Sequence, residues 1–284
     1  MTTTHTLQTD QVDLVYDVRG PLPPADGRPA LVMIGQPMEA AGFATLASYF
    51  PDRTVITYDP RGLGRSTRKD GRTDYTPDDQ AADLRALVGA LGLGPVEVFG
   101  SSGGAVTGLA WVSAHPDDVA TLVAHEPPLL AQLPDAEAAF RAREGVRDAY
   151  LAGGVGAGFA AFGQMTSWQG EFTDAYFDQP VPGGGSQDGG GSGDDPLLSE
   201  RSWAVSGYHL DVDALNAAST RVIIAVGIES KDTLTGRTSN GTAESLGQDA
   251  TVFPSHHGGF LGPEFGYPGQ PEAFAARLHE VLAG

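Results

Sequence analysis

The sequence predicts an α/β protein with a mostly parallel, eight-stranded sheet, helices on both faces and an inserted lid. Short apolar runs alternate with helix-like segments over residues 1–126 and again over 219–284. Most of these runs are apolar throughout, which is typical of parallel strands that are covered on both sides. One of them, at 96–99, leads directly into the pentapeptide GSSGG at 100–104 and then into an Ala-rich segment. These observations favour one layered domain with a sharp strand-to-helix turn near its centre.

Each element is expected from its own pattern. Thr76 and Pro77 give one helix a clear start, with an N-cap residue, proline at the first helical position and acids behind it. The predicted helices cover 39–50, 76–91, 105–114, 239–247 and 271–282. The predicted strands cover 6–8, 12–18, 30–34, 54–58, 96–99, 121–125, 221–226 and 250–253.

The alternation stops between 127 and 218. This stretch mixes Ala-, Phe- and Tyr-rich helical patches with a Gly-rich segment at 181–196 that has too few apolar residues to build a core. We therefore expect residues 1–126 and 219–284 to form the core domain. Residues 127–218 are expected to form a cap (lid) insertion, with a mobile loop at 181–196.

Composition excludes several classes of function. The chain of 284 residues has no cysteine, which excludes disulfides, zinc–thiolate sites and a cysteine nucleophile. A formal charge of −19 and a pI near 4.5 argue against nucleic acid and anionic membranes as partners. There is no metal cluster, phosphate loop or dinucleotide fingerprint, so we expect no metal and no cofactor.

The same composition gives expectations for location. No window reaches 18 apolar residues, and the first residues lack the basic and apolar regions of a secretory signal. We therefore expect a cytoplasmic protein. Plentiful arginine, alanine and glycine with two lysines suggest a bacterial source, and the oligomeric state stays open.

Ser102 is the predicted nucleophile. It is the centre of a G-x-S-x-G pattern between a strand and a helix, the pattern of a nucleophile elbow. The glycines relieve crowding in a turn that lifts the serine hydroxyl clear of the sheet. The next backbone N–H, that of Gly103, then lies at a helix start, where it can stabilise an oxyanion.

Other motifs follow in a familiar order. A Gly35-Gln36-Pro37 turn ends the third strand, the segment YDPRGLGRS at 58–66 follows the fourth, and a His-Gly pair at 257–258 follows the last. Over nearly the whole chain this order resembles the α/β-hydrolase superfamily, in its serine-nucleophile, carboxylesterase-like branch. The resemblance implies a catalytic triad and an oxyanion hole. Asp59 and residues 61–66 are interpreted as structural.

The general base is expected on the loop after the last strand. Both His256 and His257 lie there. The resemblance favours His257, because family members carry the catalytic histidine just before a small residue, here Gly258. A serine hydroxyl needs such a base to become a nucleophile at neutral pH.

The acid that orients the histidine is left open between three carboxylates. The commonest family pattern has an aspartate where this chain has Ser230. Glu126, at the end of the strand 121–125, is the first choice, because some branches of the family carry a glutamate there. Glu229 is the runner-up and Asp232 the third candidate.

The remaining site residues are expected from position and chemistry. The backbone N–H groups of Gln36 and Gly103 are predicted to form the oxyanion hole. The Gln36 amide is also a candidate to approach the substrate. An aromatic and Met-rich lid would line an apolar pocket, with Phe162, Met165, Trp168 and Trp203 as candidates.

The predicted function is hydrolysis of a carboxylic ester or lactone through an acyl-enzyme on Ser102, with a small-molecule ester as the substrate. The alternatives are a C–C bond hydrolase, a thioesterase or a secondary-metabolism tailoring enzyme on the same triad. A further alternative is a non-catalytic, ligand-binding homologue, suggested by the serine at 230.

Overall fold

A twisted sheet of nine strands forms the centre of the computed structural model, which describes residues 2–180 and 194–284. Eight strands follow the order β1-β2-β4-β3-β6-β7-β8-β9, and β5 pairs with β2 beside them. The strands are β1 (Thr2–Gln8), β2 (Val12–Arg19), β3 (Leu31–Gln36), β4 (Val55–Tyr58), β5 (Thr67–Arg68), β6 (Val96–Ser102), β7 (Val119–His125), β8 (Arg221–Gly227) and β9 (Thr251–Phe253).

The sheet is mostly parallel. β3, β4 and β6 to β9 pair in parallel, whereas β1 and β5 pair antiparallel with β2, and β2 pairs antiparallel with β4. The predicted fold class is therefore confirmed, and the prediction of eight strands is wrong by one. The missed strand, β5, has two residues and forms by pairing with β2, a long-range contact that its own short sequence does not predict.

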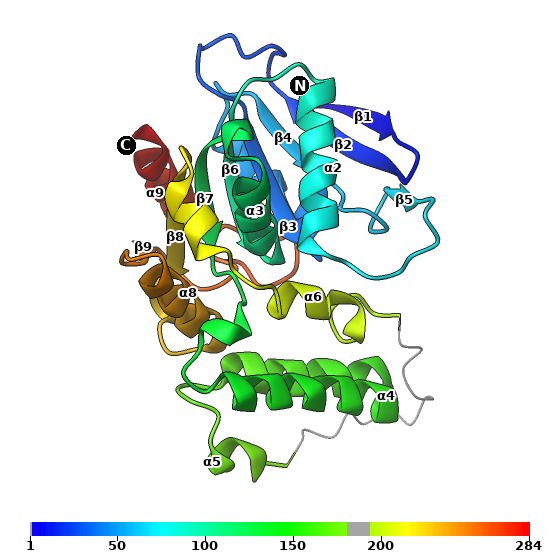
Figure 1. The fold of residues 1–284 in the computed structure, drawn as a ribbon, viewed down its shortest axis with the longest axis vertical. Coiled ribbons are helices and arrows are strands. Elements are labelled where there is room, and N and C mark those ends of the chain that lie inside the picture. The colour runs from blue at the N-terminus through cyan, green and yellow to red at the C-terminus, as the bar shows by residue number, and fades with distance from the viewer. Residues whose placement is uncertain (1, 181–193) are drawn as a thin grey trace.

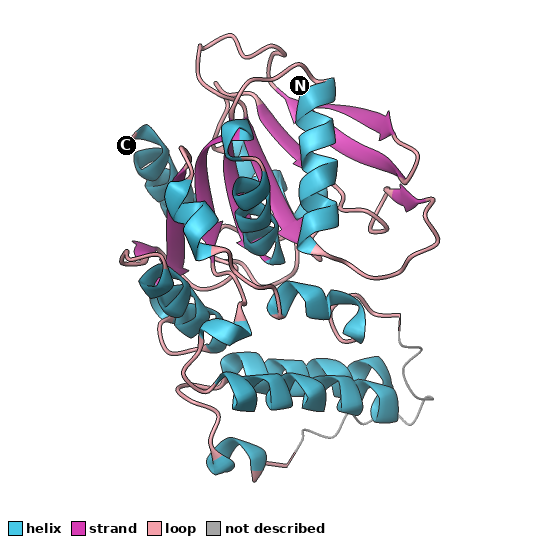
Figure 2. Cartoon of the chain, viewed as in Figure 1, coloured by secondary structure: helices cyan, strands magenta, loops and turns pink. Residues whose placement is uncertain are grey.

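Helices cover both faces of the sheet (Figures 1 and 2). Alternate residues of the central strands point to opposite faces. Val32 and Ile34 join one core cluster with residues of α2, α3 and α8, and Leu31 and Met33 join another with residues of α1 and α9. The helices that cover the sheet are α1 (Ala44–Ser48), α2 (Pro77–Ala90), α3 (Gly103–Ala114), α8 (Leu234–Ser245) and α9 (Pro271–Ala283).

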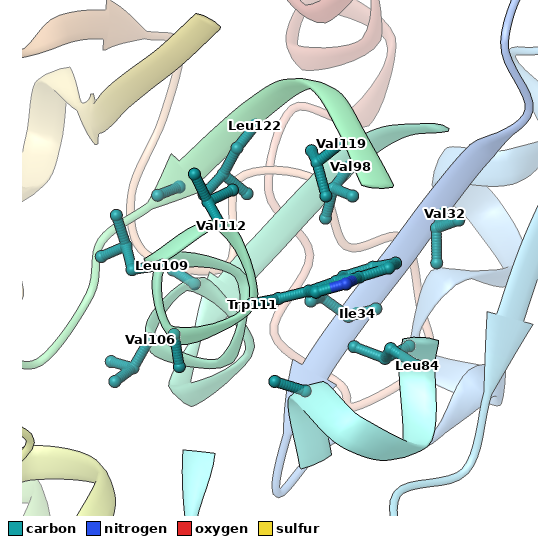
Figure 3. Close-up of a cluster of buried hydrophobic side chains, with 14 of the residues drawn as sticks. Val32, Ile34, Leu84, Val98, Val106, Leu109, Trp111, Val112, Val119 and Leu122 are labelled. Atoms are coloured by element: carbon teal, nitrogen blue, oxygen red, sulfur yellow. The ribbon is translucent and has the colours of Figure 1, made fainter. Parts of the chain in front are cut away.

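The first of these clusters fixes α3, the helix that begins beside the predicted nucleophile. Figure 3 shows the indole of Trp111 among Ile34 of β3, Leu84 of α2 and Val98 of β6. Trp111 is fully buried, and its Nε1 donates a hydrogen bond to the Asp118 carboxylate. Burying an aromatic side chain of this size removes a large apolar area from water, so α3 is held firmly against the sheet.

Residues between β7 and β8 form a helical layer beyond one end of the sheet (Figure 1). Its largest element, α4 (Ala136–Ser167), turns at Gly154, which has a φ of 76°. A Cβ on Gly158 would lie 3.3 Å from the Cα of Tyr150. Eight residues span about 12 Å in a straight helix, so α4 is two helical segments packed on each other. The layer also contains α5 (Asp174–Phe177) and α6 (Trp203–Ser206), whereas α7 (Val212–Ala217) packs against α3 beside the sheet.

The end of the predicted insertion packs with the core domain. Val205, Leu210 and Leu215 belong to the same buried cluster as Trp111, and α7 packs against α3. The core packing therefore resumes before the predicted boundary at 218, because the apolar side of α7 is buried against the sheet layer. The predicted mobile loop at 181–196 falls mainly on residues 181–193, which lie outside the described residues. Among the helices of the described ranges, none is both long and apolar enough to span a membrane.

Candidate active site

Ser102 occupies a sharp turn between β6 and α3. Its φ of 56° is a left-handed conformation that side chains rarely adopt. The turn needs its glycines, because a Cβ on Gly100 would lie 2.7 Å from the Gly104 carbonyl oxygen. A Cβ on Gly104 would collide with the backbone carbonyl of Ile34. The sequence therefore folds here into the expected elbow, with the serine at the tip.

A cavity of about 510 Å³ opens beside Ser102. Ser102, Gly103 and His257 line it at the ends of the sheet strands, and residues of α4 and α6 line it as well. The Ser102 hydroxyl has no hydrogen-bond partner among the described residues. Ser102 and His257 therefore share the cavity without a direct hydrogen bond, and catalytic hydrogen bonds of this kind tighten when substrate binds.

His257 is held by a carboxylate from another strand. Its Nδ1 lies 2.7 Å from Oε2 of Glu126, which directly follows β7. The Glu126 side chain is fully buried, whereas 42% of the His257 side chain is exposed toward the cavity. The buried partner thus fixes one ring nitrogen and leaves the other on the accessible side.

Glu126 is fully engaged in hydrogen bonds. Its Oε1 accepts one from the Gly227 backbone N–H at 2.9 Å, and its Oε2 accepts one from the Thr235 hydroxyl at 2.5 Å. Burial raises the pKa of this carboxyl, but the hydrogen bond and charge of His257, the charge of His125 and the Thr235 hydroxyl outweigh burial. The pKa of Glu126 therefore lies well below its ordinary value, and the group is an anion that stabilises a positive imidazole.

The other two candidate acids make other contacts. Glu229 is exposed, and its Oε1 accepts a hydrogen bond from the Gln270 side chain at 3.3 Å. Asp232 is also exposed, and its backbone carbonyl accepts a bond from Gly170. Neither carboxylate is bonded to His257 among the described contacts, although Glu229 also lines the cavity. Of the three candidates, the structure brings Glu126 to the histidine.

Gln36 lies directly across from Ser102, because β3 and β6 pair in parallel with Gln36 opposite Ser102 in register. Its backbone also approaches Gly103 closely, since a Cβ on Gly103 would lie 2.7 Å from the Gln36 carbonyl oxygen. The Gln36 side chain lines the cavity and is 3% exposed. Among the described residues, neither its Oε1 nor its Nε2 has a hydrogen-bond partner. An unpaired buried amide is costly, so this side chain is available to a ligand.

Three of the four predicted pocket residues line the cavity: Phe162, Met165 and Trp203. The prediction for Trp168 is wrong, because this residue is not among the described lining residues. Its Nε1 donates to the Glu171 carbonyl at 2.9 Å, and its ring packs on Tyr176. Trp168 therefore belongs to the core of the helical layer.

The sequence reasoning missed Thr235 and Arg143. Thr235 supports Glu126 from α8, and no local pattern marks it. Arg143 lines the cavity from α4, and a signal for it exists. It lies on the helix face of Ala139, Val146 and Tyr150, which are buried, so an arginine interrupts an apolar stripe.

The segment at 58–66, interpreted from the sequence as structural, makes hydrogen bonds and ion pairs with its neighbours. The Asp59 carboxylate accepts from the Ala40 backbone N–H at 3.0 Å and pairs with Arg65. Arg61 is buried and paired with Asp83, whose Oδ2 lies 2.7 Å from Nε. Over residues 2–180 and 194–284 the structure contains no cluster of three or more histidine, aspartate or glutamate side chains arranged to hold a metal.

Known sequences similar to this chain include a family model and several hydrolases. Residues 29–162 match the family model described as alpha/beta hydrolase fold. The chain is 26% identical over 282 residues to the uncharacterized hydrolase YraK of Bacillus subtilis, covering 98% of this chain and 95% of that protein. It is 34% identical over 98 residues to a proline iminopeptidase of Xylella fastidiosa, covering 34% of this chain and 31% of that one.

Comparison with solved structures gives the same fold. A thermophilic esterase from Thermogutta terrifontis, solved with malate bound, superposes with a TM-score of 0.65 at 20% identity. The match covers 98% of both chains. At this level of identity the likeness concerns the fold, and the chemistry must be argued from the site itself.

Proposed function

Since this chain is a hydrolase of the α/β-hydrolase superfamily, we propose that it cleaves carboxylic esters or lactones through an acyl-enzyme on Ser102. One observation carries the proposal. The buried Glu126 carboxylate is 2.7 Å from Nδ1 of His257, and His257 lines the same cavity as Ser102. A nucleophile, a base and an anion behind the base are the parts that this chemistry needs.

Each step follows from these positions. Ser102 Oγ attacks the substrate carbonyl carbon while His257 takes the hydroxyl proton through Nε2. The imidazolium then gives this proton to the alcohol oxygen as the ester C–O bond breaks. Water, deprotonated by the same histidine, attacks the acyl-enzyme, and the acid is released with Ser102 reprotonated. Glu126 accepts the hydrogen bond from Nδ1–H and stabilises the charged ring during both the formation and the hydrolysis of the acyl-enzyme.

Two backbone N–H groups are suited to hold the oxyanion. Gly103 begins α3, so its N–H points out of the helix N-terminus, where partial positive charge accumulates. Gln36 lies beside it across the β3–β6 pairing and precedes Pro37 on the cavity wall. Donors fixed in this way stabilise the tetrahedral intermediate without reorganising, which contributes roughly 3–4 kcal/mol per donor in other serine hydrolases.

The site favours a serine hydrolase over a non-catalytic homologue. That alternative rested on the serine at 230, and Glu126 supplies a carboxylate to the histidine from the neighbouring strand instead. A serine at 102 also disfavours the aspartate-nucleophile branches, since these form an ester with a side-chain carboxylate. Thioesters and C–C bonds stay alternatives for the same machinery.

The test uses p-nitrophenyl acetate and butyrate with three proteins: wild type, Ser102→Ala and Ser101→Ala. Ser101 is the matched control, because it is the adjacent serine but is buried, with its hydroxyl 3.4 Å from Nδ1 of His125. We expect burst release of nitrophenol and fluorophosphonate labelling in wild type and Ser101→Ala, with both lost in Ser102→Ala. Wild-type protein that neither releases nitrophenol nor takes the label would contradict the proposal.

A further inference from the structure

Arg143 brings a positive charge into an otherwise mostly apolar cavity. It extends from α4 and lines the cavity together with Leu130, Val146, Phe162 and Met165. Glu229 is the other Asp, Glu, Lys or Arg residue among the described lining residues, and its carboxylate is exposed and bonded to Gln270. An arginine among apolar side chains is costly to keep unless something pairs with it.

The described structure gives Arg143 no carboxylate partner. Its Nη2 donates a weak hydrogen bond to the Ser202 hydroxyl at 3.4 Å, and its guanidinium carbon lies 5.0 Å from the ring centre of Trp203. A hydroxyl and an aromatic face do not neutralise its charge. Burial lowers the pKa of Arg143 to about 10 although the charge of Glu200, which is itself paired with Arg147, raises it, so the group is still a cation at neutral pH.

Arg147, one helical turn later, contacts the same tryptophan and serves as a comparison for Arg143. Its guanidinium also lies 5.0 Å from the Trp203 ring centre. Unlike Arg143, it is paired with Glu200 at 2.6 Å and with Asp148 at 2.8 Å, and it does not line the cavity. Both arginines therefore pack against Trp203, but Arg147 is paired with carboxylates outside the cavity, whereas Arg143 lines the cavity without a carboxylate partner.

We propose that Arg143 binds a carboxylate of the substrate, so that the preferred ester or lactone carries an anionic group at the end of an apolar spacer. This inference rests on the proposed hydrolase function. The planar guanidinium matches a carboxylate in two parallel hydrogen bonds, and the neighbouring Ser202 hydroxyl can donate a third. The apolar residues between the core domain and α4 suit the spacer.

Two pairs of ester series test the proposal, each comparing a carboxylate with its methyl ester, and the comparison of wild type with the Arg143 variants cancels the intrinsic reactivity of each ester. In the first, p-nitrophenyl half-esters of adipate, pimelate and suberate are compared with their neutral methyl esters. In the second, para-butyryloxybenzoate is compared with its methyl ester. In this series the carboxylate lies on the alcohol (phenol) side of the scissile ester instead of the acyl side. The quantity measured is the ratio of kcat/KM for the anionic ester to kcat/KM for the neutral one. The proteins are wild type, Arg143→Met, Arg143→Lys and Arg147→Met.

In wild type we expect a ratio well above one in at least one series. Arg143→Met should lower it by roughly tenfold or more, mainly through KM, because charge-assisted hydrogen bonds are lost. Arg143→Lys should keep part of the preference, and Arg147→Met should keep all of it. The inference is overturned if wild type prefers the neutral ester in both series, or if Arg143→Met and Arg147→Met keep the same ratio.

A binding measurement separates this inference from the proposed function. Calorimetric titration of Ser102→Ala with monomethyl adipate requires no turnover, and dimethyl adipate is its neutral control. Anion binding that disappears in Ser102→Ala/Arg143→Met supports the carboxylate site even if no ester is hydrolysed. Turnover of neutral esters with no binding of the anion overturns the carboxylate site and leaves the proposed function intact.

Discussion

The carboxylate of Glu126 reaches across the ends of two strands to lie 2.7 Å from Nδ1 of His257, which is 131 residues later in the chain. It directly follows β7, and its backbone is turned by a φ of 51°. Gly227, at the end of β8, donates its N–H to the same carboxylate. A Cβ at Gly227 would lie 3.0 Å from Oε1 of Glu126, so the absence of a side chain there keeps room for the acid. The end of β8 thus supports the carboxylate that comes from β7.

Replacing this acid should remove most of the activity. We expect Glu126→Gln to lower kcat for p-nitrophenyl butyrate by roughly a hundredfold or more, because a neutral amide neither stabilises the imidazolium nor fixes the required tautomer. Glu229→Gln is the matched control, with a carboxylate on the neighbouring strand end that bonds to Gln270. Its effect should be far smaller. Equal losses in the two variants, or a larger loss in Glu229→Gln, would contradict the assignment.

Thr235 should act as a positioning residue through Glu126. Its hydroxyl donates to Oε2, the oxygen that also contacts His257. Thr235→Val keeps the shape and removes the donor, so we expect kcat to fall by roughly tenfold. Thr235→Ser keeps the donor and should restore most of kcat. Since Thr235 also lines the cavity, a change that appears in KM alone and is not rescued by serine would indicate a packing role instead.

Local sequence patterns predicted most of the fold because they coincide here with the final packing. The apolar run 96–99 and the N-cap at Thr76 lie where the structure has β6 and the start of α2, whose Asp79 N–H bonds to the Thr76 hydroxyl at 3.2 Å. The packing of α7 ahead of the expected boundary at 218 could not be predicted in this way. α7 is short and its burial against α3 is a long-range contact, which periodicity within one segment does not reveal.

Some residues of the candidate site could likewise be predicted from local sequence patterns, and others could not. Ser102 could be found because its chemistry requires glycines at fixed neighbouring positions. Glu126 stayed one of three candidates, since the side chain that meets His257 depends on how strand ends are turned in space. Arg143 was missed because a long helix with one arginine on its apolar face has the same local pattern whether that arginine reaches solvent or a cavity.

Replacing Gln36 should raise stability while it lowers activity. Among the described residues its side-chain amide is buried with no partner, and such a group costs about 1–3 kcal/mol of folding free energy. Gln36→Met has a similar length and keeps the backbone N–H, so we expect a higher Tm and a reduced kcat/KM. The measurements are thermal unfolding and butyrate ester kinetics. A lower Tm would contradict the unpaired state of the amide, and unchanged kinetics would contradict its contact with substrate.

His125 should make stability depend on pH. It is fully buried between Phe99, Phe253 and Phe274, and burial lowers its pKa from 6.5 to about 4. Between pH 4 and pH 6.5, therefore, His125 is protonated in the unfolded chain and neutral in the folded chain. Because stability rises with pH where the unfolded state holds more protons, this group stabilises the fold fully above pH 6.5 and loses that contribution as pH falls toward 4.

The test compares wild type with His125→Phe by urea unfolding across this pH range. A shift of this size is worth about 3 kcal/mol, so wild type should lose roughly that much more stability than His125→Phe between the two ends of the range. The comparison cancels the titration of the shared groups that do not interact with His125, whatever the substitution does to absolute stability. His5→Phe, on exposed β1, should retain the wild-type slope. Parallel pH profiles for wild type and His125→Phe would contradict the lowered pKa, because they would mean that His125 binds its proton equally in the folded and unfolded states.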